Sequence, residues 1–95
     1  MTQYQKGANF ERQLKKDMEE CGHYVCRSAG SHGDWDLVAI DRSTNEILLI
    51  QCKDKALTKK DWDKYDTAKN KFPHKEGIKF FLVCKDNRER KWLEL

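Results

Sequence analysis

Apolar residues near the start of the chain recur every three or four positions. Phe10, Leu14, Met18 and Cys21 follow this spacing, and charged residues occupy most of the positions between them. An α-helix has 3.6 residues per turn, so these apolar side chains would form one stripe along it. The pattern predicts an amphipathic helix, and Gly22 is expected to end it as a C-terminal cap.

The pattern then changes to short apolar runs that are typical of strands. We expect strands over residues 23–28, 36–41 and 45–53. The third run is almost continuously apolar, which is typical of a strand that is buried on both faces. Residues 42–45 read Arg-Ser-Thr-Asn and predict a hairpin turn between the second and third strands.

A second helix is expected to start at Thr58, because Thr58 and Asp61 have the spacing of a capping box. Its apolar face consists of Trp62, Tyr65, Ala68 and Phe72. Pro73 lies at its end. Residues 78–84 predict a fourth strand, and residues 91–95 add a fifth if they pair at the edge of the sheet.

The order of these elements indicates the fold class. Parallel strands need a long crossover connection, which the second helix can supply between the third and fourth strands. We therefore expect those two strands to be parallel neighbours. The prediction is an α/β protein with a central mixed sheet of four to five strands flanked by helices, in one domain over residues 1–95.

The composition and the first residues limit the expected partners and location of the protein. The net charge of +3 permits nucleic acid as a partner without requiring it. The first residues lack the apolar core of a signal peptide and no run is long enough to cross a membrane, so an intracellular protein without a membrane partner is expected.

The four cysteines are expected to be reduced rather than bridged. Cys21, His23 and Cys26 lie close together in the sequence, but a structural zinc site needs a fourth ligand and no second pair follows at a suitable spacing. We expect instead that strand alternation turns Tyr24 and Cys26 together into the core.

The stretch from Asp36 to Lys53 carries the strongest chemical signal. A hairpin centred near Ser43 and Thr44 would bring Asp36 close to Gln51 or Lys53. Gln51 and Lys53 share one face of their strand, while Cys52 points into the core. Carboxylate and carbonyl oxygens suit Mg²⁺ or Mn²⁺, and a nearby lysine can activate water or stabilise charge on a phosphate. These groups are the equipment of metal-assisted phosphodiester hydrolysis.

At this point the chain resembles a known family. Asp36, about fifteen residues before Gln51-Cys52-Lys53, is similar to the PD-(D/E)XK nuclease motif. Residues 6–14 resemble the Lys-Gly-x-x-x-Glu-Arg-x-Leu opening of archaeal Holliday-junction resolvases, and residues 22–31 resemble their strand and loop with Arg-Ser-Ala. The motifs match in order and spacing over about the first 55 residues.

The resemblance implies a restriction-endonuclease-like fold and roles for individual residues. Glu11, Asp36 and Gln51 would hold Mg²⁺ or Mn²⁺, and with Lys53 they would form the catalytic set. The residues that would contact DNA are Lys6, Arg12, Arg27, Ser28, Ser31, His32 and Lys55. The family also implies branched DNA as the substrate and a homodimer, in which part of the apolar face of the second helix would form the interface.

Two positions depart from the family pattern. Trp35 stands where the motif has proline, at a position that shapes the turn. Gln51 stands where it has glutamate, which removes one negative charge and predicts weaker Mg²⁺ binding or a preference for Mn²⁺. A Gln-x-Lys motif also resembles Mrr-type restriction nucleases.

Three functions therefore stand beside one another. The first is a metal-dependent endonuclease that cuts branched DNA, the second a general or Mrr-like nuclease, and the third a DNA-binding module that lost cleavage through Gln51. Each site residue also has a structural reading. Glu11 could be a solvated helix residue, Asp34 a turn residue that competes with Asp36 for the motif, and Lys53 a lysine at a strand end.

Overall fold

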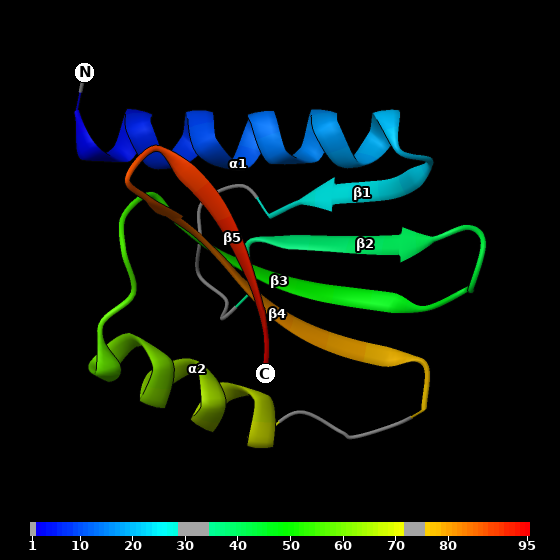
Figure 1. Ribbon diagram of the computed structural model, residues 1–95. Coiled ribbons are helices and arrows are strands. Elements are labelled where there is room, and N and C mark those ends of the chain that lie inside the picture. Colours follow the sequence, from blue (N-terminus) through cyan, green and yellow to red (C-terminus); the bar gives the residue numbers. More distant parts are fainter. Residues whose placement is uncertain (1, 29–34, 72–75) are drawn as a thin grey trace.

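A single mixed β-sheet lies between two helices (Figure 1). The computed structural model describes residues 2–28, 35–71 and 76–95. The helices are α1 (Gln3–Glu20) and α2 (Lys59–Lys71), and the strands are β1 (His23–Arg27), β2 (Leu37–Asp41), β3 (Ile47–Lys53), β4 (Ile78–Asp86) and β5 (Glu89–Glu94). The predicted α/β class and the order of elements are confirmed, and the fifth strand is present.

Both helices begin with side-chain caps. Thr2 and Gln5 form a capping box at the start of α1, with the Gln5 N–H donating to Thr2 Oγ1 at 3.1 Å. The capping box predicted for α2 is also present, because the Asp61 N–H donates to Thr58 Oγ1 at 3.2 Å and the Thr58 N–H donates to Asp61 Oδ2 at 3.1 Å. Gly22 follows α1 with a φ of 95°, so it ends the helix in the left-handed conformation that glycine tolerates best.

The strands are arranged in chain order, β1-β2-β3-β4-β5. The pairs β1–β2, β2–β3 and β4–β5 are antiparallel, whereas β3 and β4 are parallel and α2 forms the crossover between them. Leu37 pairs with Ile50 and Ile40 with Ile47, so the β2–β3 hairpin is centred between Ser43 and Thr44 as predicted. The C-terminal ends of β3 and β4 therefore lie at the same end of the sheet.

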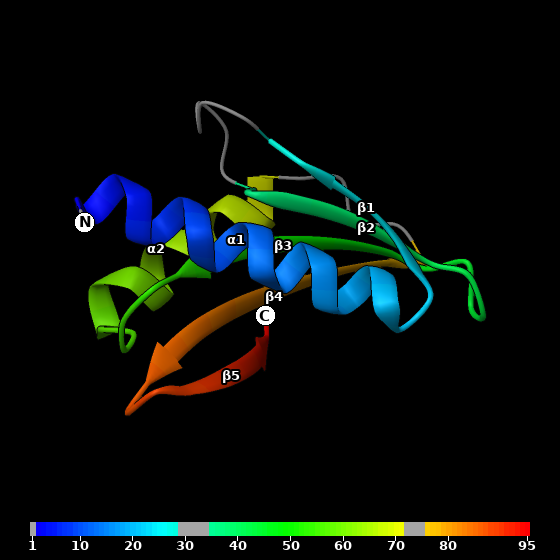
Figure 2. The same cartoon turned by 90° about the horizontal axis from the view of Figure 1, so that it is seen from above.

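The core is built mainly between α1 and one face of the sheet (Figure 2). Its buried side chains are Leu14, Met18, Val25, Leu37, Ala39, Leu48, Ile50 and Val83. Several side chains on the other face of β3 and β4 are also buried, and Tyr65 and Ala68 are the buried residues of α2. This second set includes Leu49, Phe80, Leu82 and Cys84. The near-continuous apolar run of β3 is thus explained by burial on both faces.

The prediction for β1 was wrong in one respect. Tyr24 and Cys26 do point to the same side, but that side is exposed, and Val25 is the residue that enters the core. Because Val25 and Arg27 face α1, alternation turns Tyr24 and Cys26 outward. Trp62 is also 38% exposed, so the buried face of α2 is narrower than predicted. Phe72 and Pro73 lie outside the described residues.

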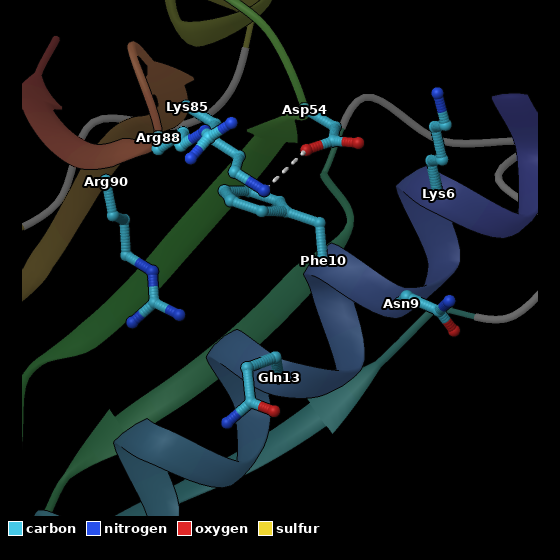
Figure 3. A pocket seen from close by; sticks show the side chains of 8 residues that line it. All are labelled: Lys6, Asn9, Phe10, Gln13, Asp54, Lys85, Arg88 and Arg90. Atoms are coloured by element: carbon cyan, nitrogen blue, oxygen red, sulfur yellow. Dashed lines mark ion pairs between the residues drawn. The ribbon is translucent and has the colours of Figure 1, made fainter.

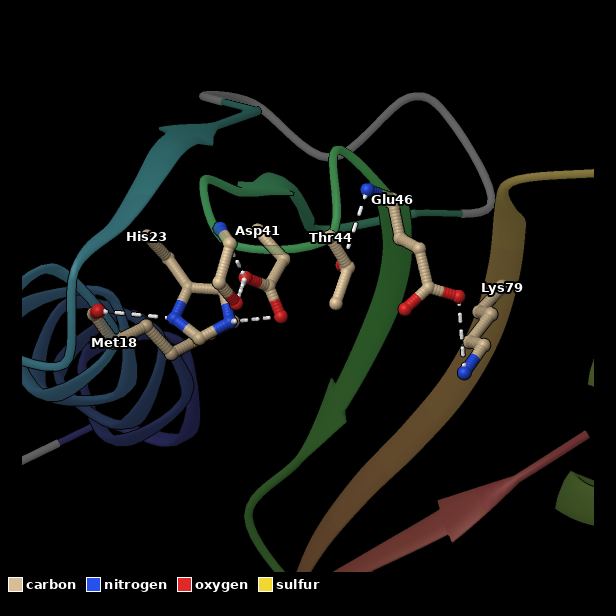
Figure 4. Close-up of polar contacts among 7 residues, drawn as sticks. Met18, His23, Asp41, Thr44, Glu46 and Lys79 are labelled. Atoms are coloured by element: carbon tan, nitrogen blue, oxygen red, sulfur yellow. Dashed lines mark hydrogen bonds and ion pairs between the residues drawn. The ribbon is translucent and has the colours of Figure 1, made fainter.

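Polar contacts join the C-terminal end of α1 to the end of the sheet that carries the β2–β3 turn (Figure 4). His23 Nδ1 lies 3.3 Å from the Met18 carbonyl oxygen, and its Nε2 lies 3.8 Å from Asp41 Oδ2. Within the described ranges, no three His, Cys, Asp or Glu side chains are grouped closely enough to hold a metal ion. Neither described helix is long and apolar enough to span a bilayer.

Candidate active site

Asp36 lies at the end of the sheet where β2 begins. Its backbone continues the ladder, with the Asp36 N–H donating to the Ile50 carbonyl and the Ser28 N–H donating to the Asp36 carbonyl, both at 2.8 Å. The carboxylate Oδ2 accepts the Cys52 N–H at 2.9 Å. The residue is only 5% exposed, and this burial raises the pKa of the Asp36 carboxyl above its ordinary value, although the Cys52 hydrogen bond and the charge of Arg27 act in the opposite direction.

Glu11 faces the same end of the sheet from α1. It is 9% exposed, and its Oε1 accepts a hydrogen bond from Arg27 Nε at 3.2 Å. Burial raises the pKa of the Glu11 carboxyl, and the negative charge of Asp36 raises it further. Two buried carboxylates from separate elements, α1 and the start of β2, therefore influence each other's charge, while their role as metal ligands stays a prediction.

Gln51 follows Ile50, the register partner of Leu37, so it lies across the hairpin from Asp36 as predicted. Its Oε1 is buried and accepts no hydrogen bond from any residue that the structure describes. An unsatisfied buried carbonyl oxygen costs free energy comparable to the loss of a hydrogen bond. A bound ligand that is not part of the polypeptide would account for this buried oxygen without a hydrogen bond.

A divalent cation fits these side chains. Glu11 and Asp36 supply buried carboxylate oxygens whose mutual repulsion a cation would relieve, and Gln51 supplies the orphaned amide oxygen. Hard oxygen ligands of this kind are typical of Mg²⁺ and Mn²⁺, which keep several waters when the protein offers few ligands. The oxygen donors of the predicted ligand set thus suit such a cation, and the set itself stays a prediction.

Lys53 ends β3 and makes a contact that the sequence did not predict. Its Nζ donates to Asp61 Oδ1 at 2.6 Å, while the other oxygen of Asp61 accepts bonds from the Thr58 N–H and hydroxyl. The hydrogen bond from Lys53, together with those from Thr58, lowers the pKa of Asp61 to about 2. The capping-box spacing identified Asp61 as a cap, and nothing in the local sequence indicated that its second oxygen would hold Lys53.

The predicted DNA-binding residues differ in their position relative to the candidate site and in their exposure. Lys6 and Lys55 line a pocket of about 410 Å³ beside Lys53, together with Gly7, Cys52, Asp54 and Tyr65. Arg27 is mostly buried against Glu11, so it braces the site, whereas Arg12 and Ser28 are exposed near it. Ser31, His32 and Asp34 lie outside the described residues.

The fold and this arrangement define a class of protein. A β-hairpin that carries Asp36 and Gln51-Cys52-Lys53, together with an acidic residue on the preceding helix, is the PD-(D/E)XK arrangement in its Gln-x-Lys form. The chain belongs to the archaeal Holliday junction resolvase (Hjc) family, whose model matches residues 2–94.

One relative and one solved structure illustrate this membership. The chain is 41% identical over 87 residues to the crossover junction endodeoxyribonuclease Hjc of Methanocaldococcus jannaschii, a match that covers 90% of this chain and 63% of that protein. The chain thus spans less than two thirds of that relative's length. The structure of Archaeoglobus fulgidus Hjc, a Holliday junction resolvase, matches with a TM-score of 0.65 at 23% identity, over 94% of this chain and 72% of the other. This structural likeness confirms the restriction-endonuclease-like fold.

The Lys53–Asp61 contact leads to a prediction about stability. Because the pKa of Asp61 falls from 3.8 to about 2 on folding, its ionised form stabilises the native state fully above about pH 4, and this contribution is lost as the pH falls toward 2. Asp61→Asn should lower the free energy of unfolding at pH 7 by up to about 1 kcal/mol. Urea titrations between pH 7 and pH 2.5 should show this difference shrinking.

Asp63→Asn provides the matched control, since Asp63 is an exposed aspartate on the same helix. It should change stability little at any of these pH values. If both variants lose the same stability, or if the loss in Asp61→Asn does not depend on pH, the ion pair does not contribute as described.

Proposed function

We propose that this protein is a metal-dependent DNA endonuclease that hydrolyses phosphodiester bonds in branched DNA such as four-way junctions. The observation that carries the proposal is the buried cluster at the end of the β2–β3 hairpin. There Glu11 and Asp36 repel each other, and Gln51 Oε1 has no hydrogen-bond partner among the described residues. Lys53 ends β3, the second strand of the same hairpin. This cluster is costly for stability alone and suits a cation-assisted reaction on a phosphate.

Each residue has a distinct part in the mechanism. Glu11, Asp36 and Gln51 would hold Mg²⁺ or Mn²⁺, which supplies positive charge to polarise the phosphate and to acidify a water molecule. Lys53 would orient the attacking water or neutralise charge on the scissile phosphate. A new P–O bond forms to the water oxygen, the bond to the leaving sugar oxygen breaks, and that oxygen takes up a proton.

Asp61 and Arg27 act through other residues. Asp61 holds the flexible Lys53 side chain in one place before DNA arrives, at 2.6 Å from its Nζ. Arg27 balances part of the charge of Glu11 and turns its carboxylate toward the site. Both contacts reduce the conformational freedom that the site would otherwise lose on binding its substrate.

The choice of a junction as the substrate is supported by the family and by its members' names, since both the Methanocaldococcus and the Archaeoglobus proteins are named for this activity. DNA as the substrate implies an intracellular protein. Gln51 keeps two further functions open, an Mrr-like nuclease acting on duplex DNA and a DNA-binding module without cleavage, because it gives the cation one negative charge fewer than glutamate would.

We further propose that two copies of the chain associate through the outer face of β1 and β2, and not through the apolar face of α2, where Tyr65 and Ala68 are already buried within one chain. Tyr24, Val38, Ile40 and Ile47 are 55%, 38%, 39% and 37% exposed. Tyr24 pairs with Ile40, which in turn pairs with Ile47, so these three side chains are neighbours on the face opposite α1. A contiguous exposed apolar patch is typical of a protein interface. A second copy is the occupant that a two-fold junction favours, because it would present two matched sites to two symmetric bonds.

Cleavage of labelled DNA tests the activity. With Mg²⁺ or Mn²⁺ the wild type should cut a four-way junction and leave a linear duplex of matched sequence intact, and a chelator should stop cleavage. Asp36→Asn and Lys53→Ala should each lower the rate at least about 100-fold, because each removes a charge needed at the reacting phosphate. Lys16→Ala, which removes a charge from an exposed position of α1, serves as the control and should cleave normally.

The outcomes separate the three functions. Cutting of both substrates with the same dependence on Asp36 would replace the resolvase with a general or Mrr-like nuclease. Binding of DNA without cleavage under either metal would show that Gln51 has abolished catalysis, and the binding-module function would take its place.

Sedimentation equilibrium tests the association. The chain has a mass of 11.3 kDa, and the wild type should sediment at about twice this value. Ile40→Lys should weaken the dimer about 10- to 100-fold, because it places an unpaired polar group in an apolar interface. Glu20→Gln makes the same change in net charge at the exposed end of α1 and should remain dimeric. An unchanged dimer in Ile40→Lys would place the interface elsewhere.

A further inference from the structure

A second, larger pocket lies between α1 and the β4–β5 hairpin (Figure 3). Its volume is about 760 Å³. Four cationic side chains line it, together with Asp54 and the ring of Phe10, and those four are Lys6, Lys85, Arg88 and Arg90. The predicted site residues include Lys6 alone from this set.

The sheet topology explains why these cations meet near the candidate active site. β3 and β4 are parallel, and Lys53 pairs with Cys84, so Lys85 and the β4–β5 turn emerge at the same end of the sheet as Lys53. Arg88 sits in that turn with a φ of 66°. A side chain other than glycine is disfavoured in this left-handed conformation, so the turn holds an arginine where stability alone would favour glycine or asparagine.

The charges of this pocket are poorly balanced within the protein. Among the described residues, neither Lys6 nor Arg88 takes part in an ion pair, and Lys85 approaches Asp54 only to 4.0 Å. Arg90 is fixed instead, at 2.9 Å from Asp17 Oδ2 and with its guanidinium 6.0 Å from the centre of the Phe10 ring. With Arg90 paired to Asp17, the other three cations lie beside one lining carboxylate, Asp54, and this imbalance costs electrostatic free energy that a bound anion would recover.

This pocket adjoins the one beside Lys53, because the two share lining residues. Lys6 and Asp54 line both pockets, so a path of cations runs from Lys53 past Lys6 to the β4–β5 turn. Several cations along a solvent-exposed surface suit a chain of phosphates better than a single small anion. Asn9 and Gln13 of α1 add amide groups along it.

We propose that this pocket binds the DNA backbone at the phosphates that flank the bond being cut. The proposal rests on the proposed nuclease function and adds to it a second subsite, formed by α1 and the β4–β5 hairpin. Arg88 and Lys6 contact phosphates, while Arg90 and Phe10 form the fixed wall against which the backbone lies. The subsite recognises phosphate and so places the DNA without reading its sequence.

The test measures how junction binding depends on salt. Each phosphate contact that is lost reduces the slope of log Kd against log salt concentration by about 0.9. Arg88→Gln should therefore weaken the binding of a four-way junction and lower this slope by about 0.9, and Lys6→Gln with Arg88→Gln should lower it by about 1.8. Binding is measured in Ca²⁺, and thermal unfolding confirms that each variant is folded.

Arg42→Gln is the matched control, because Arg42 is an exposed arginine in the β2–β3 turn at the opposite end of the sheet. It should leave both the affinity and the slope unchanged. Junctions that carry a neutral methylphosphonate at single positions beside the cut site extend the test. At the position contacted by Arg88, the neutral linkage should weaken wild-type binding and have no further effect on the Arg88→Gln protein.

The results distinguish a failure of the phosphate subsite from a failure of the proposed nuclease function. If the wild type binds and cuts the junction while Arg88→Gln keeps the wild-type slope, or if no methylphosphonate position is coupled to Arg88, the subsite is wrong and the nuclease stands. If the wild type neither binds nor cuts DNA, the proposed function fails, and the subsite fails with it.

Discussion

The hydrogen bond from the Cys52 N–H to Asp36 Oδ2 is the contact on which the site depends. In this bond, 2.9 Å long, the Asp36 carboxylate accepts the backbone N–H of Cys52 at the end of the β2–β3 ladder. The carboxylate is thereby fixed where β3 changes from apolar to polar residues, across the hairpin from Gln51. Because side chains alternate along a strand, Lys53 then projects on the same side as Gln51. A shift of one residue in this register would separate Asp36 from Gln51 and Lys53.

The cost of this arrangement is electrostatic. Burial raises the pKa of both Glu11 and Asp36, and each is paired only in part, by Arg27 in one case and by a backbone N–H in the other. An arrangement selected for stability alone would not place two repelling carboxylates and an orphaned amide oxygen together. With a bound divalent cation, as proposed, the same groups would become favourable.

Much of the fold could be predicted because the sequence patterns have few alternatives. The capping box at Thr58, the polar turn at residues 42–45 and the length of the α2 crossover lead directly to the hairpin and the parallel β3–β4 pair. The orientation of β1 could not be predicted, because Tyr24, Val25 and Cys26 are all apolar. Alternation then identifies two faces without showing which of them meets α1.

The site could be predicted in part for a related reason. Asp36, Gln51 and Lys53 are near in sequence and lie on one hairpin, so the register alone brings them together. The Lys53–Asp61 contact and the pocket lined by Arg88 depend instead on how α2 and the β4–β5 turn pack in three dimensions. No local pattern carries that information, and the charges at residues 88–91 look like an ordinary solvated turn in the sequence.

Calorimetric titration with Mn²⁺ shows whether Glu11, Asp36 and Gln51 form the proposed site for a divalent cation. The wild type should bind Mn²⁺, whereas Asp36→Asn, which keeps the shape of the side chain, should remain folded and lose this binding. Equal Mn²⁺ affinity in the two proteins, or no binding to the wild type at millimolar concentrations, would contradict the account.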